Sequence, residues 1–301
     1  MPQRIDAHHH LWRYTAEEYS WIDNAMMNLR RDYTPADLSK AMESAGIDGS
    51  IAVQARQTLE ETHDLLLLAD AHPFIKAVVG WAPIASRDFP SFLENLAAHP
   101  KLRGLRHVVQ SEPDDDFILG SDFNRGIRTL LPTGLIYEIL IYERHLPQTI
   151  QFVDAHPNQI FVLDHIAKPR IREQILSPWR ERIEDLARRE NVFCKVSGMV
   201  TEADWQLWTE ADLRPYLDTV FDAFGAHRLM MGSDWPVCLV ATEYARWFDF
   251  LDSYVAALSE DERGQFCGGT ASRVYRLTEM AKSPQIGGVS TKSRNADACK
   301  K

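Results

Sequence analysis

Residues 5–12 read Ile-Asp-Ala-His-His-His-Leu-Trp, an apolar start followed by an acidic residue and three histidines. This run predicts a buried strand with polar residues at its end. Because successive side chains of a strand point to opposite faces, His8 and His10 are expected on one face and His9 on the other. Two imidazoles on one face can bind one metal ion. The alternative is a cluster of loop histidines without a function.

Seven further short apolar segments are expected to be strands, and helical patterns lie between them: 49–55, 75–81, 102–109, 135–141, 159–163, 192–196 and 229–231. Two closing helices are expected at 243–258 and 259–277. Eight strands alternating with helices predict a single (β/α)8 TIM barrel over residues 1–277. An open doubly wound sheet is the second choice, but no Gly-rich phosphate loop follows the first strand. Residues 278–301 are rich in Ser, Lys and Gly and are expected to form a disordered tail.

The composition restricts the partners. The 301 residues include 33 Lys and Arg and 43 Asp and Glu, giving a net charge of −10, which argues against nucleic acid or an anionic membrane as partner. No run approaches 18 uninterrupted apolar residues and the first ten have no apolar signal region, so a cytoplasmic location is expected. The four scattered cysteines are expected to be reduced. Neither a monomer nor a homo-oligomer is excluded.

In such a barrel the active site lies at the carboxyl ends of the strands. The residues expected to converge there are His8, His10, Gln54, Trp81, Arg106, Tyr137, His165, Ser197 and Asp234. The long polar and aromatic segment 13–32 follows the first strand and is typical of a lid over a pocket. Its Tyr14 and Tyr19 are expected to pack onto the barrel instead.

Six motifs occur in order along the chain: IDAHHHLW (5–12), LRRDYTPADL (29–38), GLRH (104–107), DHIAKP (164–169), KVSG (195–198) and GSDWPV (232–237). With them the chain resembles the amidohydrolase superfamily and, within it, the amidohydrolase 2 group of small lactonases. The resemblance implies a distorted (β/α)8 barrel that hydrolyses a lactone ring. Sugar lactonases of the L-fuconolactone and L-rhamnonolactone type are the nearest relatives implied; dicarboxylate lactonases and a zinc decarboxylase are more distant.

Opening a lactone requires a nucleophilic water, stabilisation of charge on the carbonyl oxygen, and an acid for the departing alkoxide. Asp234, beside Trp235 and Pro236, is expected to act as general base and then as acid; the alternative is a helix N-cap. His165 and Arg106 are expected to polarise the carbonyl or to bind a substrate group. For His165 the alternative is a packed histidine with no part in the reaction.

The expected cofactor is one divalent metal ion, Zn²⁺ or Mn²⁺, bound by His8, His10 and Asp234, with His165 as a further candidate ligand. Metal-binding members of this superfamily commonly place a ligand histidine after the fourth or fifth strand. No histidine directly follows the fifth strand here, which argues against tight binding of the metal ion. Whether catalysis needs the metal stays open, since the same histidines could donate hydrogen bonds to the substrate. The substrate-binding candidates are Trp12, Trp21, Gln54, Trp81, His107, Tyr137, Lys168 and Trp235.

Some of these candidates have plain structural alternatives. Only one of Arg106 and His107 can face the barrel interior. Lys168 before a proline could only cap the sixth strand, Ser197 could only form a turn, and tryptophans are more often core than ligand-facing.

The sequence therefore predicts a hydrolase that opens a small sugar-acid lactone, with a 1,4 or 1,5 ring. A dicarboxylate lactonase, a metal-dependent decarboxylase and a silent sugar-binding barrel are the alternatives. Asp234 and His165 argue against the silent barrel, since a binder has no need of a proton-transfer carboxylate.

Overall fold

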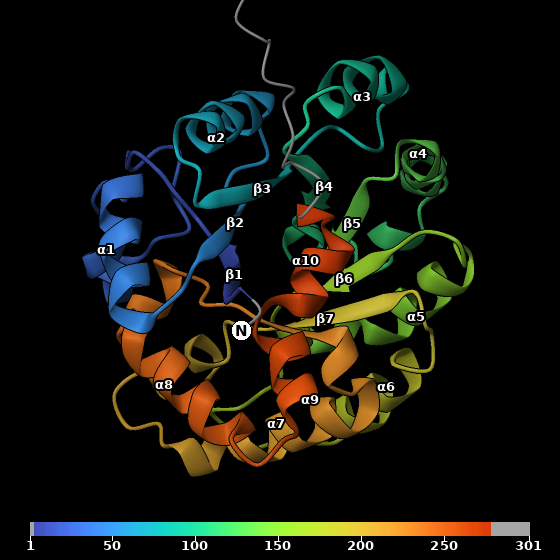
Figure 1. Cartoon of the computed structure of the whole chain (residues 1–301). Coiled ribbons are helices and arrows are strands. Elements are labelled where there is room, and N and C mark those ends of the chain that lie inside the picture. The colour runs from blue at the N-terminus through green and yellow to red at the C-terminus, as the bar shows by residue number, and fades with distance from the viewer. Residues whose placement is uncertain (1–2, 278–301) are drawn as a thin grey trace, which may run out of the picture.

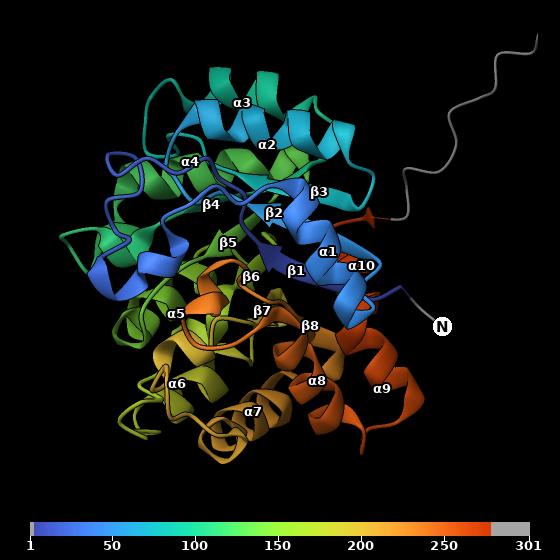
Figure 2. The same cartoon turned by 90° about the vertical axis from the view of Figure 1, so that its left-hand side faces the viewer.

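The computed structural model describes residues 3–277, so the predicted tail lies outside the described residues. Eight parallel strands pair in sequence order into one barrel (Figures 1 and 2). They are β1 (Ile5–His9), β2 (Gly49–Val53), β3 (Ile75–Gly80), β4 (Leu102–His107), β5 (Ile136–Ile139), β6 (Phe161–Leu163), β7 (Val192–Val196) and β8 (Leu229–Met231). The predicted (β/α)8 barrel is confirmed, and each strand overlaps its predicted segment.

The barrel is distorted where its first and last strands meet. No ladder joins β8 to β1; an isolated bridge between His9 and Trp235 closes the gap. The backbone N–H of Asp234 donates to the His8 carbonyl at 2.8 Å, and that of His10 donates to the Trp235 carbonyl at 2.6 Å. The motifs at 5–12 and 232–237 therefore meet at the seam.

Helices surround the barrel (Figures 1 and 2). They are α1 (Pro35–Ala45), α2 (Leu59–Ala71), α3 (Phe89–Ala97), α4 (Ser121–Leu130), α5 (Leu146–Asp154), α6 (Trp179–Leu186), α7 (Glu210–Phe224) and α8 (Tyr244–Val255). The Thr34 side chain accepts from the Asp37 N–H and the Asp37 side chain accepts in return, so a capping box starts α1 as the local sequence predicts.

The prediction of a single closing helix over 259–277 is wrong. The chain instead forms α9 (Glu260–Gly264), a π-helical turn (Gln265–Gly269) and α10 (Thr270–Val274). A Cβ on Gly268 would lie 1.9 Å from the Gln3 carbonyl oxygen. The segment therefore has to adapt to a backbone that packs directly against it, and an unbroken helix does not form.

Two apolar cores result. The outer core lies between sheet and helices. The inner core fills the barrel and consists of Ile5, Ala7, Ile51, Val53, Ala77, Val79, Ile136, Val162 and Met230, together with Ala271 and Tyr275. Figure 1 shows α10 lying across the barrel axis, so it closes the end opposite the carboxyl ends of the strands.

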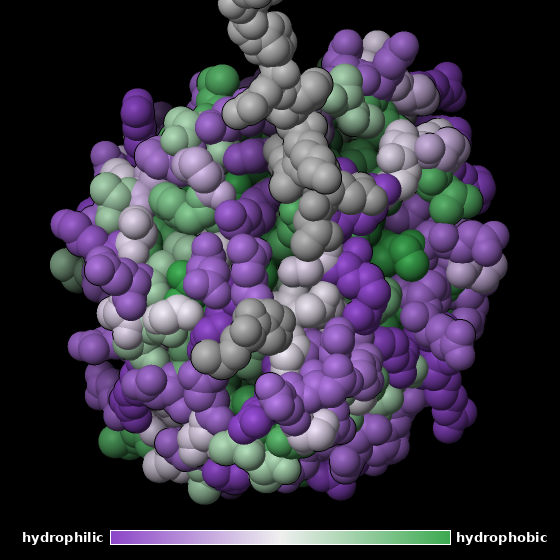
Figure 3. Space-filling view, viewed as in Figure 1, coloured by the Kyte–Doolittle hydropathy of each residue, from purple (hydrophilic) through white to green (hydrophobic). Residues whose placement is uncertain are grey.

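The face of the molecule seen in Figure 1 is mostly hydrophilic, with apolar residues only in scattered groups (Figure 3). None of the helices within residues 3–277 combines the length and the apolar character needed to cross a membrane.

Candidate active site

A β-bulge in β1 decides which histidines enter the barrel. Ile5 and Ala7 belong to the inner core, so regular alternation would next turn His9 inward. The pairing with β2 shifts between Asp6 and His9, which adds one residue to β1. His8 and His10 face the interior as a consequence. They share a face as predicted, but the bulge is what makes it the inner one.

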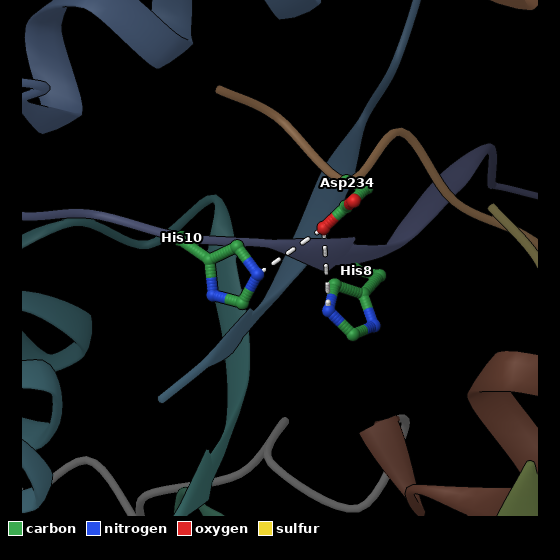
Figure 4. A group of neighbouring side chains, drawn as sticks. All are labelled: His8, His10 and Asp234. Carbon is green, nitrogen blue, oxygen red and sulfur yellow. Dashed lines mark hydrogen bonds and ion pairs between the residues drawn. The ribbon is translucent and has the colours of Figure 1, made fainter. Parts of the chain in front are cut away.

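Asp234 stands at the centre of three histidines. Its Oδ1 lies 3.2 Å from His10 Nε2 and 3.8 Å from the Nε2 atoms of both His8 and His165; Figure 4 shows the first two contacts. Its backbone is left-handed, with φ 58°. Its side chain makes no N-cap hydrogen bond to the turn that follows, so the capping alternative is wrong. Within residues 3–277, no hydrogen bond or ion pair reaches its Oδ2.

The hydrogen bonds show which ring nitrogens of His8 and His10 carry protons. His10 Nδ1 lies 2.8 Å from the Val53 carbonyl oxygen, which only accepts, so Nδ1 carries a proton and neutral His10 offers a lone pair at Nε2. Arg106 donates to His8 Nε2 at 3.2 Å, so this atom carries no proton and its lone pair is directed at Arg106. The contact between His10 Nε2 and Asp234 Oδ1 needs a proton or a cation between the two atoms. His8, His10 and Asp234 lie close enough together to hold a divalent metal ion in that place.

Burial and the neighbouring side chains shift the pKa values of Asp234 and His165. Burial alone would raise the pKa of Asp234, but His165, the hydrogen bond to His10 and the proximity of His8 outweigh it and hold this pKa below its ordinary value. Burial lowers the pKa of His165 to about 4, against the opposing pull of Asp234 and Asp164. At neutral pH, Asp234 is therefore ionised and His165 is neutral.

A buried network of charges lies on the other side of His8. Asp164 Oδ1 is 3.4 Å from His8 Nδ1 and 3.3 Å from Lys195 Nζ, and Asp164 Oδ2 accepts from Arg106 at 2.9 Å. Lys195 Nζ lies 2.6 Å from Glu138 Oε1, which also accepts from the Tyr275 hydroxyl. A chain of polar contacts thus runs from α10 through the barrel to His8.

A second carboxylate holds the loop after β8. Asp6 accepts from the backbone N–H and the hydroxyl of Ser233, at 2.8 and 2.6 Å, and from the Tyr244 hydroxyl at 3.0 Å. Burial raises the pKa of Asp6 to about 6 despite these bonds. Asp6 faces the helix layer and acts on the site only by fixing the backbone beside Asp234.

His165 enters the site from a left-handed turn. Four consecutive residues, 165–168, have φ values of 53°, 48°, 62° and 48°. Non-glycine residues in this conformation cost roughly 1–2 kcal/mol each, so the surrounding structure must impose it. Trp179 Nε1 donates to the Ile166 carbonyl at 2.8 Å, and Ser197 Oγ lies 2.9 Å from His165 Nδ1. Gly198, with φ 63°, leaves room for the ring, since a Cβ there would lie 2.6 Å from His165 Nδ1.

Arg106 faces the interior, and both terminal nitrogens of its guanidinium already have protein partners. Besides Asp164 and His8 it donates to the Gln54 carbonyl, and Gln54 Nε2 returns a bond to the Arg106 carbonyl at 3.2 Å. Gln54 is fully buried beside it. Both residues border the site, and Arg106 positions His8 and Asp164 more directly than it could contact a substrate.

His107 faces away from this cluster, which resolves the choice between it and Arg106. Trp81 Nε1 donates to His107 Nδ1 at 3.3 Å, His107 Nε2 lies 2.6 Å from Glu112 Oε1, and Phe117 stacks on the ring. The Trp81 indole N–H and both ring nitrogens of His107 therefore have hydrogen-bond partners within the protein.

The structure does not place Tyr137 at the site, where it was predicted. Its ring is fully buried on the helix side of the sheet among Phe123, Phe152 and Phe161. The β5 residue that faces the interior is Glu138, bonded to Lys195. Tyr137 was expected to face the cleft, whereas the register of β5 turns Glu138 inward instead.

The predicted aromatic residues lie at the rim near β1. Trp12 stacks on His10 with ring centroids 6.4 Å apart and contacts Trp21 edge-on at 5.9 Å. Trp235 packs against Tyr33. Of the three tryptophans, Trp21 is well exposed at 41%, while Trp12 and Trp235 are buried. Tyr19 is buried against Trp12, as expected for a ring packed onto the barrel.

Sequence reasoning missed Lys195, Glu138, Asp164 and Tyr275 as parts of the site. A signal was present in three of them: each is a charged residue within or directly after a short apolar strand, where burial requires an opposite charge. Tyr275 gave no such signal, because α10 is separated from the barrel strands in sequence.

Comparison with known proteins agrees with this architecture. The amidohydrolase family profile matches residues 5–277. The chain belongs to the amidohydrolase family. An L-fucono-1,5-lactonase from Burkholderia multivorans is 43% identical over 291 residues, covering 92% of this chain and 97% of that protein. An L-fucono-1,5-lactonase from Burkholderia ambifaria is 35% identical, with the same coverage.

A solved amidohydrolase from Burkholderia multivorans with bound zinc superposes with a TM-score of 0.87 at 42% identity, covering 91% of this chain and 99% of that one. The predicted superfamily and the predicted class of enzyme are thus confirmed for this amidohydrolase.

Proposed function

We propose that this amidohydrolase is a lactonase that opens the ring of a small sugar-acid lactone to the free aldonate, with L-fucono-1,5-lactone as the first substrate to test. Two relatives with this activity in their names share 43% and 35% of their residues with this chain. The observation that carries the proposal is Asp234: an ionised carboxylate with one oxygen facing three histidines and the other without a protein partner among the described residues.

Asp234 moves the proton in the proposed reaction. Its Oδ2 accepts a proton from a water molecule as the water oxygen bonds to the lactone carbonyl carbon. The bond between that carbon and the ring oxygen then breaks, and Asp234 returns the proton to the departing oxygen. The products are a carboxyl group and a hydroxyl group on one open chain, and Asp234 is again ionised.

His165 stabilises the developing charge on the carbonyl oxygen. With Ser197 Oγ donating to Nδ1, the Nε2 of neutral His165 carries the proton and points toward the Asp234 side of the site. A donor held in place by a strained turn and a hydroxyl needs no reorganisation when the charge develops. Arg106 supports this arrangement by holding Asp164 and His8.

The residues present fit one divalent metal ion, held by His8, His10 and Asp234 with His165 nearby. Zn²⁺ takes imidazole nitrogens and carboxylate oxygens, and a related structure contains it; Mn²⁺ accepts similar ligands. When bound, the ion supplies Lewis-acid polarisation and lowers the pKa of water.

The test is the initial rate of acid release, followed with a pH indicator, over L-fuconolactone, L-rhamnonolactone and L-galactonolactone. We expect turnover above spontaneous opening on one stereochemical subset. Absence of turnover on all three by folded, zinc-supplemented protein would overturn the proposal. Running the panel after chelation, with the metal content measured, shows whether the ion is required.

A further inference from the structure

A pocket of about 380 Å³ lies beside the catalytic cluster, and the loops after β5, β6 and β7 line it. Its wall includes Tyr142, Lys168, Thr201, Glu202 and Trp205. Two of these loops also carry His165 and Ser197. The negative charge of Asp234 raises the pKa of Glu202, in addition to the larger effect of burial, so the two carboxylates are close enough to interact.

Lys168 and Glu202 form an incomplete pair in this pocket. Their charged atoms, Lys168 Nζ and Glu202 Oε1, are 4.0 Å apart, which is too long for a hydrogen bond, and both side chains are less than a quarter exposed. Within residues 3–277, neither side chain makes a hydrogen bond to another group; Lys168 Nζ only lies over the Tyr142 ring at 5.6 Å. Partly buried polar groups normally have partners, so this pair has donors and acceptors left for a ligand.

The other charged residues of the wall differ in this respect. Each forms an ion pair in which at least one side chain is a third or more exposed to solvent: Arg144 with Asp115, Arg170 with Glu173, Arg172 with Asp204, and Glu143 with Arg182. Both side chains of the first three pairs are more than a third exposed, so water can satisfy them, and the buried Glu143 Oε2 has Arg182 as its partner. Lys168 and Glu202 are both less than a quarter exposed.

The positions of both residues are fixed by the backbone. Lys168 is the last residue of the left-handed turn that begins at His165, and its N–H donates to the His165 carbonyl at 2.8 Å. The Glu202 carbonyl accepts from the Arg172 N–H at 2.9 Å, which ties the loops after β6 and β7 together. One strained turn therefore presents a catalytic histidine on one side and Lys168 on the other.

The chemistry of the pair selects a ligand. A hydroxyl group placed between them accepts a hydrogen bond from the ammonium and donates one to the carboxylate. The rings of Tyr142 and Trp205 offer apolar faces for the C–H groups of the same molecule.

We propose that Lys168 and Glu202 are the specificity pair of this enzyme and bind hydroxyl groups of a neutral, polyhydroxylated lactone. This inference rests on the proposed lactonase function.

The test compares two lactones with the same six-membered ring: L-fucono-1,5-lactone, which carries hydroxyls, and δ-valerolactone, which carries none. Glu202→Gln and Lys168→Met should each raise KM for the sugar lactone at least tenfold and leave kcat/KM for δ-valerolactone within twofold. If δ-valerolactone opens slowly, its inhibition constant against the sugar lactone replaces kcat/KM. The matched control is Glu181→Gln, an exposed carboxylate outside this pocket, which should alter the kinetics of neither lactone.

Equal losses on both lactones would overturn the inference, because the pair would then act through His165 or the fold. Unchanged KM for the sugar lactone in both variants would overturn it as well. If the unaltered protein opens the sugar lactone while the variants fail this comparison, only the specificity pair is wrong. If the unaltered protein opens neither lactone, the proposed function fails and the inference fails with it.

Discussion

Asp164 and Asp234 approach the same imidazole from its two nitrogens: Asp164 Oδ1 lies 3.4 Å from His8 Nδ1, and Asp234 Oδ1 lies 3.8 Å from His8 Nε2. Both are buried, and the pKa of each is held below its ordinary value against the effect of burial. The difference lies in what compensates the charge. Asp164 contacts two permanent cations, Lys195 and Arg106, whereas Asp234 contacts only imidazoles.

A low carboxyl pKa alone therefore does not identify a catalytic residue. A carboxylate held between lysine and arginine has its charge compensated by permanent cations, and removing it leaves those cations buried and unpaired. A carboxylate among neutral imidazoles keeps its capacity for a proton or a metal ion. The two aspartates should consequently fail in different ways when each is replaced by asparagine.

The largest expected effect is on turnover in Asp234→Asn. The amide keeps the shape but cannot take a proton from water, so kcat for lactone opening should fall by about 10²–10⁴-fold. The measurement is the indicator assay on the best lactone, with the urea midpoint confirming that the variant is folded. A variant with near-normal kcat would end the proposed role of Asp234 and the contrast with Asp164.

Asp164→Asn should instead affect stability. Removing this charge leaves Lys195 and Arg106 buried with only Glu138 as counter-charge, and breaking a buried pair in this way costs about 3–5 kcal/mol. Urea unfolding of Asp164→Asn and Asp234→Asn side by side measures the difference. If Asp234→Asn were the more destabilised of the two, the division between a structural and a catalytic carboxylate would be incorrect.

Glu61 extends the comparison to a buried carboxylate with no ion pair to a side-chain cation among residues 3–277. It accepts from the backbone N–H groups of Ala55 and Arg56, and burial raises its pKa from 4.5 to about 7. Between these values the native state keeps the proton and the unfolded chain releases it, so the free energy of unfolding falls as pH rises. Below this window the protonated form contributes its full stability, and above it the loss is complete.

In Glu61→Gln that loss, on the order of 3 kcal/mol, should disappear between pH 4.5 and 7. Urea unfolding across this range measures it, with the exposed neighbour Glu60→Gln as the matched control. Parallel pH curves for the Glu61 variant and the unaltered protein would show that Glu61 ionises normally.

The smallest expected effect is that of Tyr275→Phe, which tests how far the Asp164 network extends. The change removes only the hydroxyl that donates to Glu138 and leaves a buried acceptor with one bond fewer, at a cost of about 1–2 kcal/mol. Tyr254→Phe is the control, since its hydroxyl donates to Asp218 at the surface. Equal unfolding free energies for the two variants would confine the network to Glu138, Lys195 and Asp164.

The sequence was sufficient for the barrel because each strand is a short apolar run with its polar residue at the end. It also grouped His8, His10 and Asp234, since strand ends of a barrel converge. It could not show that a bulge turns the histidines inward, because the bulge depends on the register with β2. It also predicted Tyr137 at the site where the structure has Glu138, because the inward-facing position depends on one residue of register in β5.

The left-handed turn at 165–168 had no sequence signal either, since none of its residues is glycine or asparagine. Tertiary contacts impose it, among them the Trp179 hydrogen bond and the space left by Gly198. Lys168 was predicted to bind substrate, but the sequence does not show that the loops after β6 and β7 bring Glu202 close to it.

The position of α10 makes the last part of the described chain close one end of the barrel. Gly268, in the turn before α10, packs against the backbone of Gln3, so both ends of the described chain meet there. Tyr275, the residue after α10, lies in the inner core and its hydroxyl donates to Glu138. A chain shortened by α10 would therefore open the interior that supports His8 to water.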